Sequence, residues 1–125
     1  MFVVCCIIIS TFASVAVSAR NMYIYNTTTT LTISSTGTAT STGKATGYQG
    51  TTTQVTIYVY LQQYKNGSWQ TVADWSDNYY SYRGTLTQTY NVTSGYKYRV
   101  KAVYYGYGNG GGNDQITTYS SEVNY

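Results

Sequence analysis

The chain has 125 residues, a formal net charge of +3, 9% charged residues, no histidine and two cysteines. This length fits one domain that buries its own core. The absence of histidine excludes Ser-His and Cys-His catalytic sites and histidine-metal sites. The mild charge, with no run of Lys or Arg, argues against nucleic acid as a partner, because phosphate binding needs several clustered cations.

Tyrosine dominates the large side chains, with 17 Tyr against 2 Phe and 2 Trp. Together with Thr, Val and Ile, tyrosine favours strands, whereas residues that favour helices are few. The composition therefore predicts an all-β domain whose solubility depends on hydroxyl and amide groups.

The N-terminal segment, residues 1–19, has the character of a secretory signal peptide. It contains no charged residue, is apolar in its first half and ends with small residues at the positions that signal peptidase reads. We predict cleavage after Ala19 and a secreted, extracellular or cell-surface protein with no stable membrane insertion afterwards. An uncleaved anchor is the alternative, since about 19 residues just span a bilayer. Cys5 and Cys6 both lie in this segment, so the mature chain would contain no disulfide and no thiolate site.

The first part of the mature chain is rich in threonine. Residues 20–30 are polar and are expected to form a leader that precedes a β-sandwich domain of residues 31–125. A first strand is expected at 31–34. Small residues alternate at 37–47, which predicts a weak strand, broken by Gly43, at a place where another sheet packs closely.

Clearer strands follow. At 55–61 four aliphatic residues alternate with polar or tyrosine side chains. The dipeptide Asn66-Gly67 then predicts a hairpin, because a type I′ turn needs positive φ at both central residues. The returning strand at 69–75 has an ambiguous buried face. A polar, tyrosine-rich connection at 76–84 leads to another alternating strand at 85–92.

Residues 95–104 form the most regular alternation in the chain. One face carries Tyr96, Tyr98, Val100, Ala102 and Tyr104, and the other carries Lys97, Arg99 and Lys101. The first face is expected to be core, and the second to meet water or a partner. A Gly-rich loop at 105–114 and a last strand at 115–123 follow. About seven strands separated by turns, with no helix, predict an antiparallel sandwich.

A family resemblance is carried by Leu61-Gln62-Gln63, Gly67-Ser68-Trp69 and Gly95-Tyr96-x-Tyr98-Arg99-Val100, in this order. Over most of residues 31–123 the chain resembles a family of small secreted β-sandwich proteins of Gram-positive bacteria that has no assigned function. More distantly, Tyr98 resembles the tyrosine corner of immunoglobulin and fibronectin type III folds, which implies a Greek-key sandwich. The missing cysteine pair argues against the true immunoglobulin family and leaves a fibronectin-like sandwich open. The resemblance brings no catalytic residue with it.

Carboxylates are too few for a convincing enzyme. Asp74 and Asp77 can in principle form the acid/base pair of a glycosidase. Their position where a strand gives way to a loop instead favours solvated turn formers. The stretch 108–114 partly matches a calcium turn, but it has one copy and one carboxylate, so a flexible loop is expected. We expect no catalytic residue, no metal site and no cofactor.

The most informative surface is the one opposite the core. Tyr58 and Tyr60 face outward on one strand, and Lys97, Arg99 and Lys101 face outward on a strand expected to be its neighbour in the sheet. We predict that these five residues bind a ligand, because Tyr and Arg are enriched in binding hot spots. The alternative is that they pack across strands and only stabilise the sheet.

These features predict a secreted, non-enzymatic binding or adhesion module. The partner would be an extracellular glycan, a polyanion or a protein surface. The alternative function is self-assembly into an extracellular fibre or matrix, with another copy of the chain as the partner. Thr- and Tyr-rich strands with low charge and no proline lack the usual protection against edge-to-edge pairing.

Overall fold

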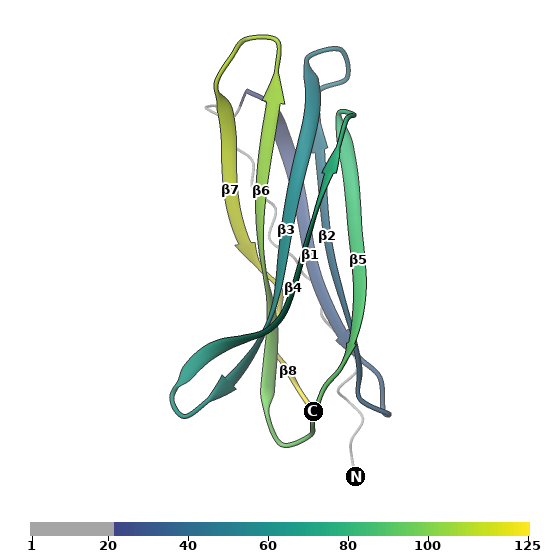
Figure 1. The fold of residues 1–125 in the computed structure, drawn as a ribbon, viewed down its shortest axis with the longest axis vertical. Coiled ribbons are helices and arrows are strands. Elements are labelled where there is room, and N and C mark those ends of the chain that lie inside the picture. The colour runs from purple at the N-terminus through teal and green to yellow at the C-terminus, as the bar shows by residue number, and fades with distance from the viewer. Residues whose placement is uncertain (1–21) are drawn as a thin grey trace.

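The computed structural model describes residues 22–125, which form two antiparallel β-sheets packed face to face (Figure 1). The predicted signal peptide, residues 1–19, lies outside the described residues. The strands are β1 (Ile24–Ile33), β2 (Thr38–Gly47), β3 (Thr52–Lys65), β4 (Ser68–Tyr79), β5 (Arg83–Asn91), β6 (Lys97–Gly108), β7 (Asn113–Tyr119) and β8 (Val123–Asn124). The predicted all-β antiparallel sandwich is confirmed.

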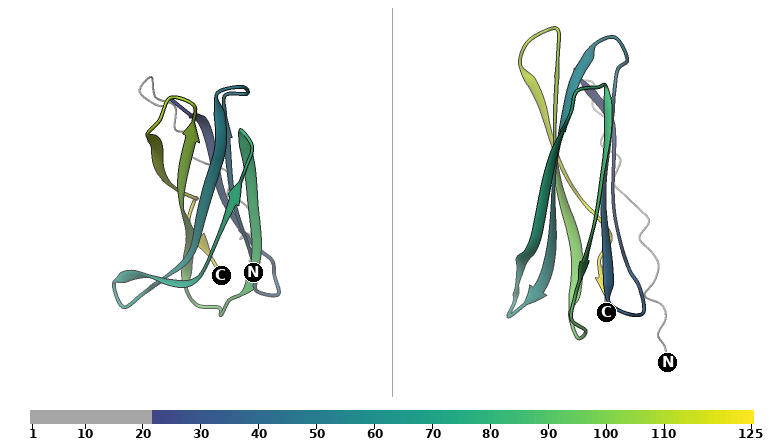
Figure 2. Two further views of the ribbon diagram at one scale, coloured as in Figure 1. Left: turned by 45° about the horizontal axis from the view of Figure 1, so that its top comes forward. Right: turned by 45° about the vertical axis from the view of Figure 1, so that its right-hand side comes forward.

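The smaller sheet has the strand order β1-β2-β5, and the larger has the order β4-β3-β6-β7, with β8 paired to the start of β6. The chain therefore changes sheet after β2, after β4 and after β5. The two sheets lie as elongated layers, and near one end the β3–β4 hairpin bends away from them to the side (Figure 2). Eight strands form instead of about seven, because the expected last strand is divided into β7 and β8. Ser120 lies just after β7, and its hydroxyl accepts a hydrogen bond from the N–H of Val100.

The prediction of a polar leader at residues 20–30 is wrong from Ile24 onward, because these residues form most of β1. Thr27 and Thr29 point inward and are fully buried. The hydroxyl of Thr29 shares hydrogen bonds with the hydroxyls of Tyr104, at 2.6 Å, and Thr118. Thr29 is thus tolerated in the interior because partners satisfy its hydroxyl, whereas the Thr27 hydroxyl has no partner within residues 22–125. The branched Cβ of threonine favours the strand at both positions.

The sequence suggested that Gly43 breaks the second strand. This expectation is wrong, since β2 is continuous from Thr38 to Gly47. A Cβ atom at Gly43 would lie 3.0 Å from the Tyr104 hydroxyl and 3.1 Å from a methyl group of Val59. Glycine therefore permits this close contact between the sheets, since a larger residue would need its neighbours to shift by a few tenths of an ångström. The expectation that small side chains mark such a contact is confirmed.

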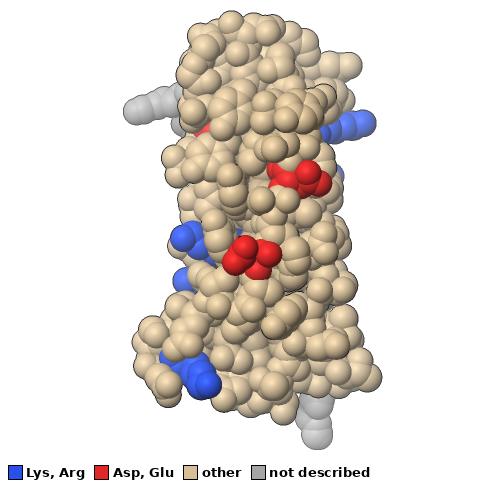
Figure 3. All heavy atoms as spheres, viewed as in Figure 1, with Lys and Arg blue, Asp and Glu red and all other residues tan. Residues whose placement is uncertain are grey.

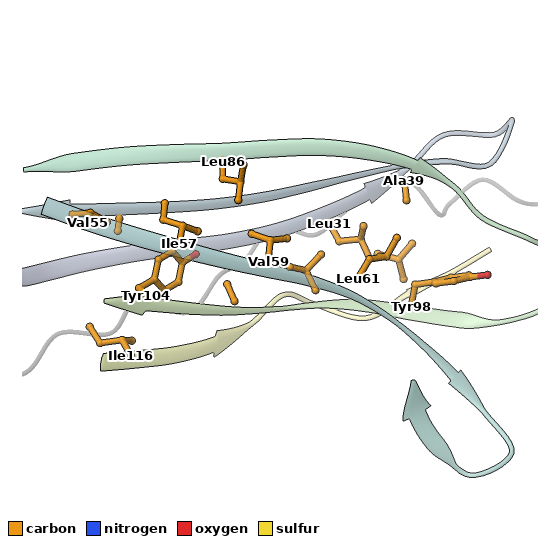
Figure 4. Packing of buried hydrophobic residues seen from close by; sticks show 14 of the residues in the cluster. Leu31, Ala39, Val55, Ile57, Val59, Leu61, Leu86, Tyr98, Tyr104 and Ile116 are labelled. Carbon is orange, nitrogen blue, oxygen red and sulfur yellow. The ribbon is translucent and has the colours of Figure 1, made fainter. Parts of the chain in front are cut away.

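Alternate residues of β3 and β6 form the centre of the core (Figure 4). The fully buried side chains of these two strands are Val55, Ile57, Val59, Leu61, Tyr98, Val100, Ala102 and Tyr104. The predicted hairpin between β3 and β4 is also confirmed, because φ is 54° at Asn66 and 80° at Gly67. Both inward faces predicted from the alternation at 55–61 and 95–104 are correct.

Two connections are shorter than the sequence suggested. The strands β4 and β5 extend into the expected connection at 76–84, because β4 stays paired with β3 as far as Tyr79. The expected loop at 105–114 is reduced in the same way, since β6 continues to Gly108 and pairs with the start of β7. Backbone pairing with a neighbour prolongs strands in which the side chains alone suggest a loop.

Asp114 links this loop to the beginning of β1. It is buried, and its carboxylate accepts hydrogen bonds from the backbone N–H groups of Met22, Tyr23 and Ile24 at 3.1, 2.7 and 2.8 Å. The Tyr23 hydroxyl donates a hydrogen bond to the carbonyl of Gly111 at 2.7 Å. The residue that sequence analysis placed in a flexible loop therefore holds the first strand against the other sheet.

We predict that the protein loses stability at alkaline pH because the hydroxyl of Tyr104 is buried. Burial raises the pKa of Tyr104 to about 12, while its hydrogen bonds act in the opposite direction. An unfolded tyrosine ionises near its ordinary value of 10.0, so its contribution to stability is complete below about pH 10 and is lost as the pH rises through 12. We expect the free energy of unfolding to fall by about 2–3 kcal/mol over this interval.

Urea unfolding of the protein and of the Tyr104→Phe variant at a series of alkaline pH values checks this prediction. The variant should be less stable at neutral pH, since the carbonyl of Thr28 loses its hydrogen bond. Its stability should then decrease less between pH 10 and 12. An equal decrease in both proteins would contradict the prediction.

Candidate functional site

The outward face of the larger sheet carries the five predicted site residues. Tyr60 on β3 lies directly opposite Lys101 on β6. Tyr58, two residues from Tyr60, and Arg99 and Lys97, at two-residue steps from Lys101, share this face because successive side chains alternate in a strand. The structure therefore brings the five residues together on one surface of two neighbouring strands.

Arg99 is at the centre of the surface and is held on three sides. Its guanidinium lies 4.3 Å from the ring centroid of Trp69 and 4.4 Å from that of Tyr119. Its Nε donates a hydrogen bond to Oε1 of Gln62 at 2.8 Å. Trp69 is on β4 and Tyr119 on β7, so these contacts extend across four of the five strands of the sheet.

The two lysines also lie over aromatic rings. Lys97 Nζ is 5.6 Å from the ring centroid of Tyr64, and Lys101 Nζ is 5.7 Å from that of Tyr60. Lys97 also forms a salt bridge of 3.5 Å with Glu122, in which both side chains are about half exposed. Such a surface pair contributes little stability. Neither Arg99 nor Lys101 forms a salt bridge with any residue in the part of the chain that the structure describes.

Additional aromatic rings make the surface continuous. The rings of Tyr64 and Trp69 are 5.1 Å apart, and those of Tyr58 and Tyr105 are 5.9 Å apart. We define the aromatic–cation face as Tyr58, Tyr60, Tyr64, Trp69, Lys97, Arg99, Lys101, Tyr105 and Tyr119. Tyr119 is 43% exposed, so the ring that covers one side of the Arg99 guanidinium is itself open to a ligand.

Sequence reasoning missed four members of this face: Tyr64, Trp69, Tyr105 and Tyr119. A signal existed for two of them, because the two-residue turn at Asn66-Gly67 sets the register that pairs Tyr64 with Trp69. The position of Tyr119 depends on the register between β6 and β7, which no turn motif in the sequence fixes.

The electrostatic character of the face is set by few charges. Figure 3 shows a surface on which charged side chains are sparse and separated by uncharged ones. Burial raises the pKa of Tyr60 above its ordinary value of 10.0, and Asp74, Tyr58 and Tyr105 add to the increase. The Tyr60 hydroxyl is therefore neutral at pH 7 and can donate a hydrogen bond to a ligand.

The geometry does not support the acid/base pair that Asp74 and Asp77 could form in principle. Both are exposed on β4, and they are three positions apart, so their side chains point to opposite faces of the strand. Residues 22–125 contain no group of three or more His, Cys, Asp or Glu that could hold a metal ion. Within the same residues, no helix has the length and apolar character needed to cross a membrane.

Comparisons of the chain with protein-family models, with curated proteins and with solved structures found no match.

We predict that Arg99 and Trp69 are energetically coupled. A double-mutant cycle of Arg99→Ala and Trp69→Ala, measured by urea unfolding, should give a coupling energy of about 0.5–2 kcal/mol, the range of cation–π contacts from exposed to desolvated sites. The matched cycle of Lys101→Ala and Trp69→Ala should be additive within about 0.5 kcal/mol, since Lys101 lies over Tyr60 instead. Additivity in the Arg99 cycle would contradict the stacking.

Proposed function

We propose that the protein is a secreted, non-enzymatic binding or adhesion module that contacts a cell-surface glycan or polyanion through its aromatic–cation face. The observation that carries the proposal is Arg99, whose guanidinium lies within cation–π distance of both Trp69 and Tyr119 on the outward face of the sheet. Arginine and aromatic residues are enriched in the hot spots of binding surfaces.

The fixed position of these side chains favours binding. A flexible arginine loses rotamer freedom when it binds a ligand, at a cost of about 0.5–1.5 kcal/mol for an immobilised side chain. Two rings and the side chain of Gln62 already restrict Arg99. The tyrosine rings beside it offer flat apolar surfaces with polar hydroxyl groups, which suit the mixed apolar and polar faces of a sugar.

An extracellular location and an immunoglobulin- or fibronectin-like Greek-key sandwich are parts of the same proposal. The sequence of residues 1–19, with its small residues before Ala19, supports secretion. The strand orders β1-β2-β5 and β4-β3-β6-β7 support the sandwich type. So does Tyr98, whose hydroxyl donates a hydrogen bond of 2.6 Å to the carbonyl of Thr93, the contact expected of a tyrosine corner.

Binding to cell-wall preparations and to whole cells tests the proposal. The Tyr58→Ala/Arg99→Ala double variant should bind at least about tenfold more weakly than the wild type, because hot-spot residues contribute about 2 kcal/mol or more. The control is Arg83→Ala, which removes an arginine over the Tyr82 ring at the start of β5, in the other sheet. Undiminished binding by a folded double variant would contradict the proposed function.

A second candidate function is self-assembly, and the open edge of β1 favours it. Among residues 22–125 this strand pairs only with β2. Its ten residues contain no charge and no proline, and its one register shift lies at its start, between Ile24 and Asn26, so the rest of the edge is regular. Soluble proteins usually protect such edges with charged residues, proline or bulges, because the unpaired backbone groups can pair with another chain. The partner would be a second copy of this chain.

Placing a charge on this edge tests self-assembly. Light scattering and electron microscopy of the wild type should show multimers or fibres that the Thr30→Lys variant forms much less readily. The control is Thr42→Lys, because Thr42 lies directly opposite Thr30 on the central strand β2. A wild type that remains monomeric at high concentration would rule out this function.

A further inference from the structure

Arg99 retains unused hydrogen-bond donors. A guanidinium has five N–H groups, and the Nε–H group binds Gln62. The four N–H groups of the terminal Nη1 and Nη2 atoms form no hydrogen bond with any side chain or carbonyl of residues 22–125. The rings of Trp69 and Tyr119 lie 4.3 and 4.4 Å from the guanidinium carbon, so they restrict the directions from which a ligand reaches these donors.

We infer that the terminal N–H groups of Arg99 bind the carboxylate of an acidic polysaccharide, a polymer built from uronic acid units. The inference deepens the proposed function and rests on it. A carboxylate is planar, and its two oxygens can accept two parallel N–H bonds from the end of one guanidinium. The free end of Arg99 therefore offers a planar pair of donors that matches this planar acceptor.

A second cation is placed to meet a neighbouring acidic unit. Lys101 is two residues from Arg99 on the same face, a separation of about 6.8 Å along an antiparallel strand. It forms no salt bridge within the described residues, whereas Lys97 has Glu122 as a partner. Arg99 and Lys101 thus present two positive charges in a row, as a polymer with repeated carboxylates requires.

The aromatic rings indicate a sugar rather than another carboxylate polymer. Tyr60 lies beside Lys101, and Tyr119 lies beside Arg99 with nearly half of its surface exposed. The C–H groups on one face of a pyranose ring pack against aromatic rings of this kind. A polypeptide of acidic residues has carboxylates on flexible chains and no such rigid apolar face.

Equilibrium binding to matched polymers tests the inference, with calorimetry as the readout. The probes are three uronate polymers (polygalacturonate, alginate and hyaluronate) and the methyl ester of polygalacturonate, which keeps the sugar backbone but masks the carboxylates. At least one uronate should bind. Its esterified or carboxyl-reduced form should bind at least about tenfold more weakly, since a hydrogen bond to a charged group is lost. Equal binding of the masked polymer would overturn the inference.

The Arg99→Lys variant separates charge from geometry. Lysine keeps the positive charge and can still lie over an aromatic ring, but it lacks the planar pair of donors. This variant should also lose about tenfold in uronate affinity while its unfolding midpoint confirms that it is folded. Arg83→Lys, the same change on the other sheet, should bind as the wild type does. Full affinity of Arg99→Lys would contradict the proposed carboxylate contact.

Further probes distinguish this inference from the proposed function. Polyphosphate, poly-glutamate and neutral galactan are measured beside the uronates. Binding to one of these three through the aromatic–cation face, with no binding to any uronate, would overturn the inference and leave the proposed function intact. No binding to any polymer, to cell-wall preparations or to whole cells would overturn both.

Discussion

The close approach of the two sheets at Gly43 is the constraint on which the rest of the fold depends. The missing side chain at this position leaves room for the Tyr104 hydroxyl, which reaches the opposite sheet and donates a hydrogen bond of 2.9 Å to the carbonyl of Thr28. Thr29 and Thr118 complete this buried group of hydroxyls. Because buried polar groups are costly unless they are paired, this network specifies how the sheets are aligned as well as how closely they pack.

The same principle explains how a chain with so much threonine forms a stable interior. Most of the buried threonine and serine hydroxyls form hydrogen bonds with other side chains or with backbone groups. The hydroxyls of Thr27 and Ser41 are the exceptions, since they have no partner within the described residues. Asp114 has a corresponding role at the other end of β1, where one carboxylate binds three successive backbone N–H groups. Edge strand β1 is therefore held at its start as well as along its length.

The sequence alone predicts those strands whose pattern is visible in consecutive residues. Alternation at 55–61 and 95–104 predicts both faces correctly, because a one-residue shift would place the whole apolar set in water. The sequence predicts a first strand at 31–34, but its earlier part from Ile24 could not be predicted, since burial of Thr29 requires partners 75 and 89 residues away. The same limit applies to the site: its cations and two of its tyrosines follow from alternation, whereas Tyr119 joins Arg99 only through the pairing of β6 with β7.

Strand β6 links the core to the surface, because its inward residues are fully buried and its outward residues carry the three cations. The position of Arg99 is therefore fixed by the packing of Tyr98 and Val100 on either side of it. The way in which the cations are held also matters. A carboxylate would neutralise a cation, but an aromatic ring restricts its movement and leaves its net charge in place. With one salt bridge among residues 22–125, this sheet combines restricted side chains with two cations, Arg99 and Lys101, that form no salt bridge, while Asp74 lies opposite Tyr60 on the neighbouring strand β4. Cations held in this way favour an anionic partner.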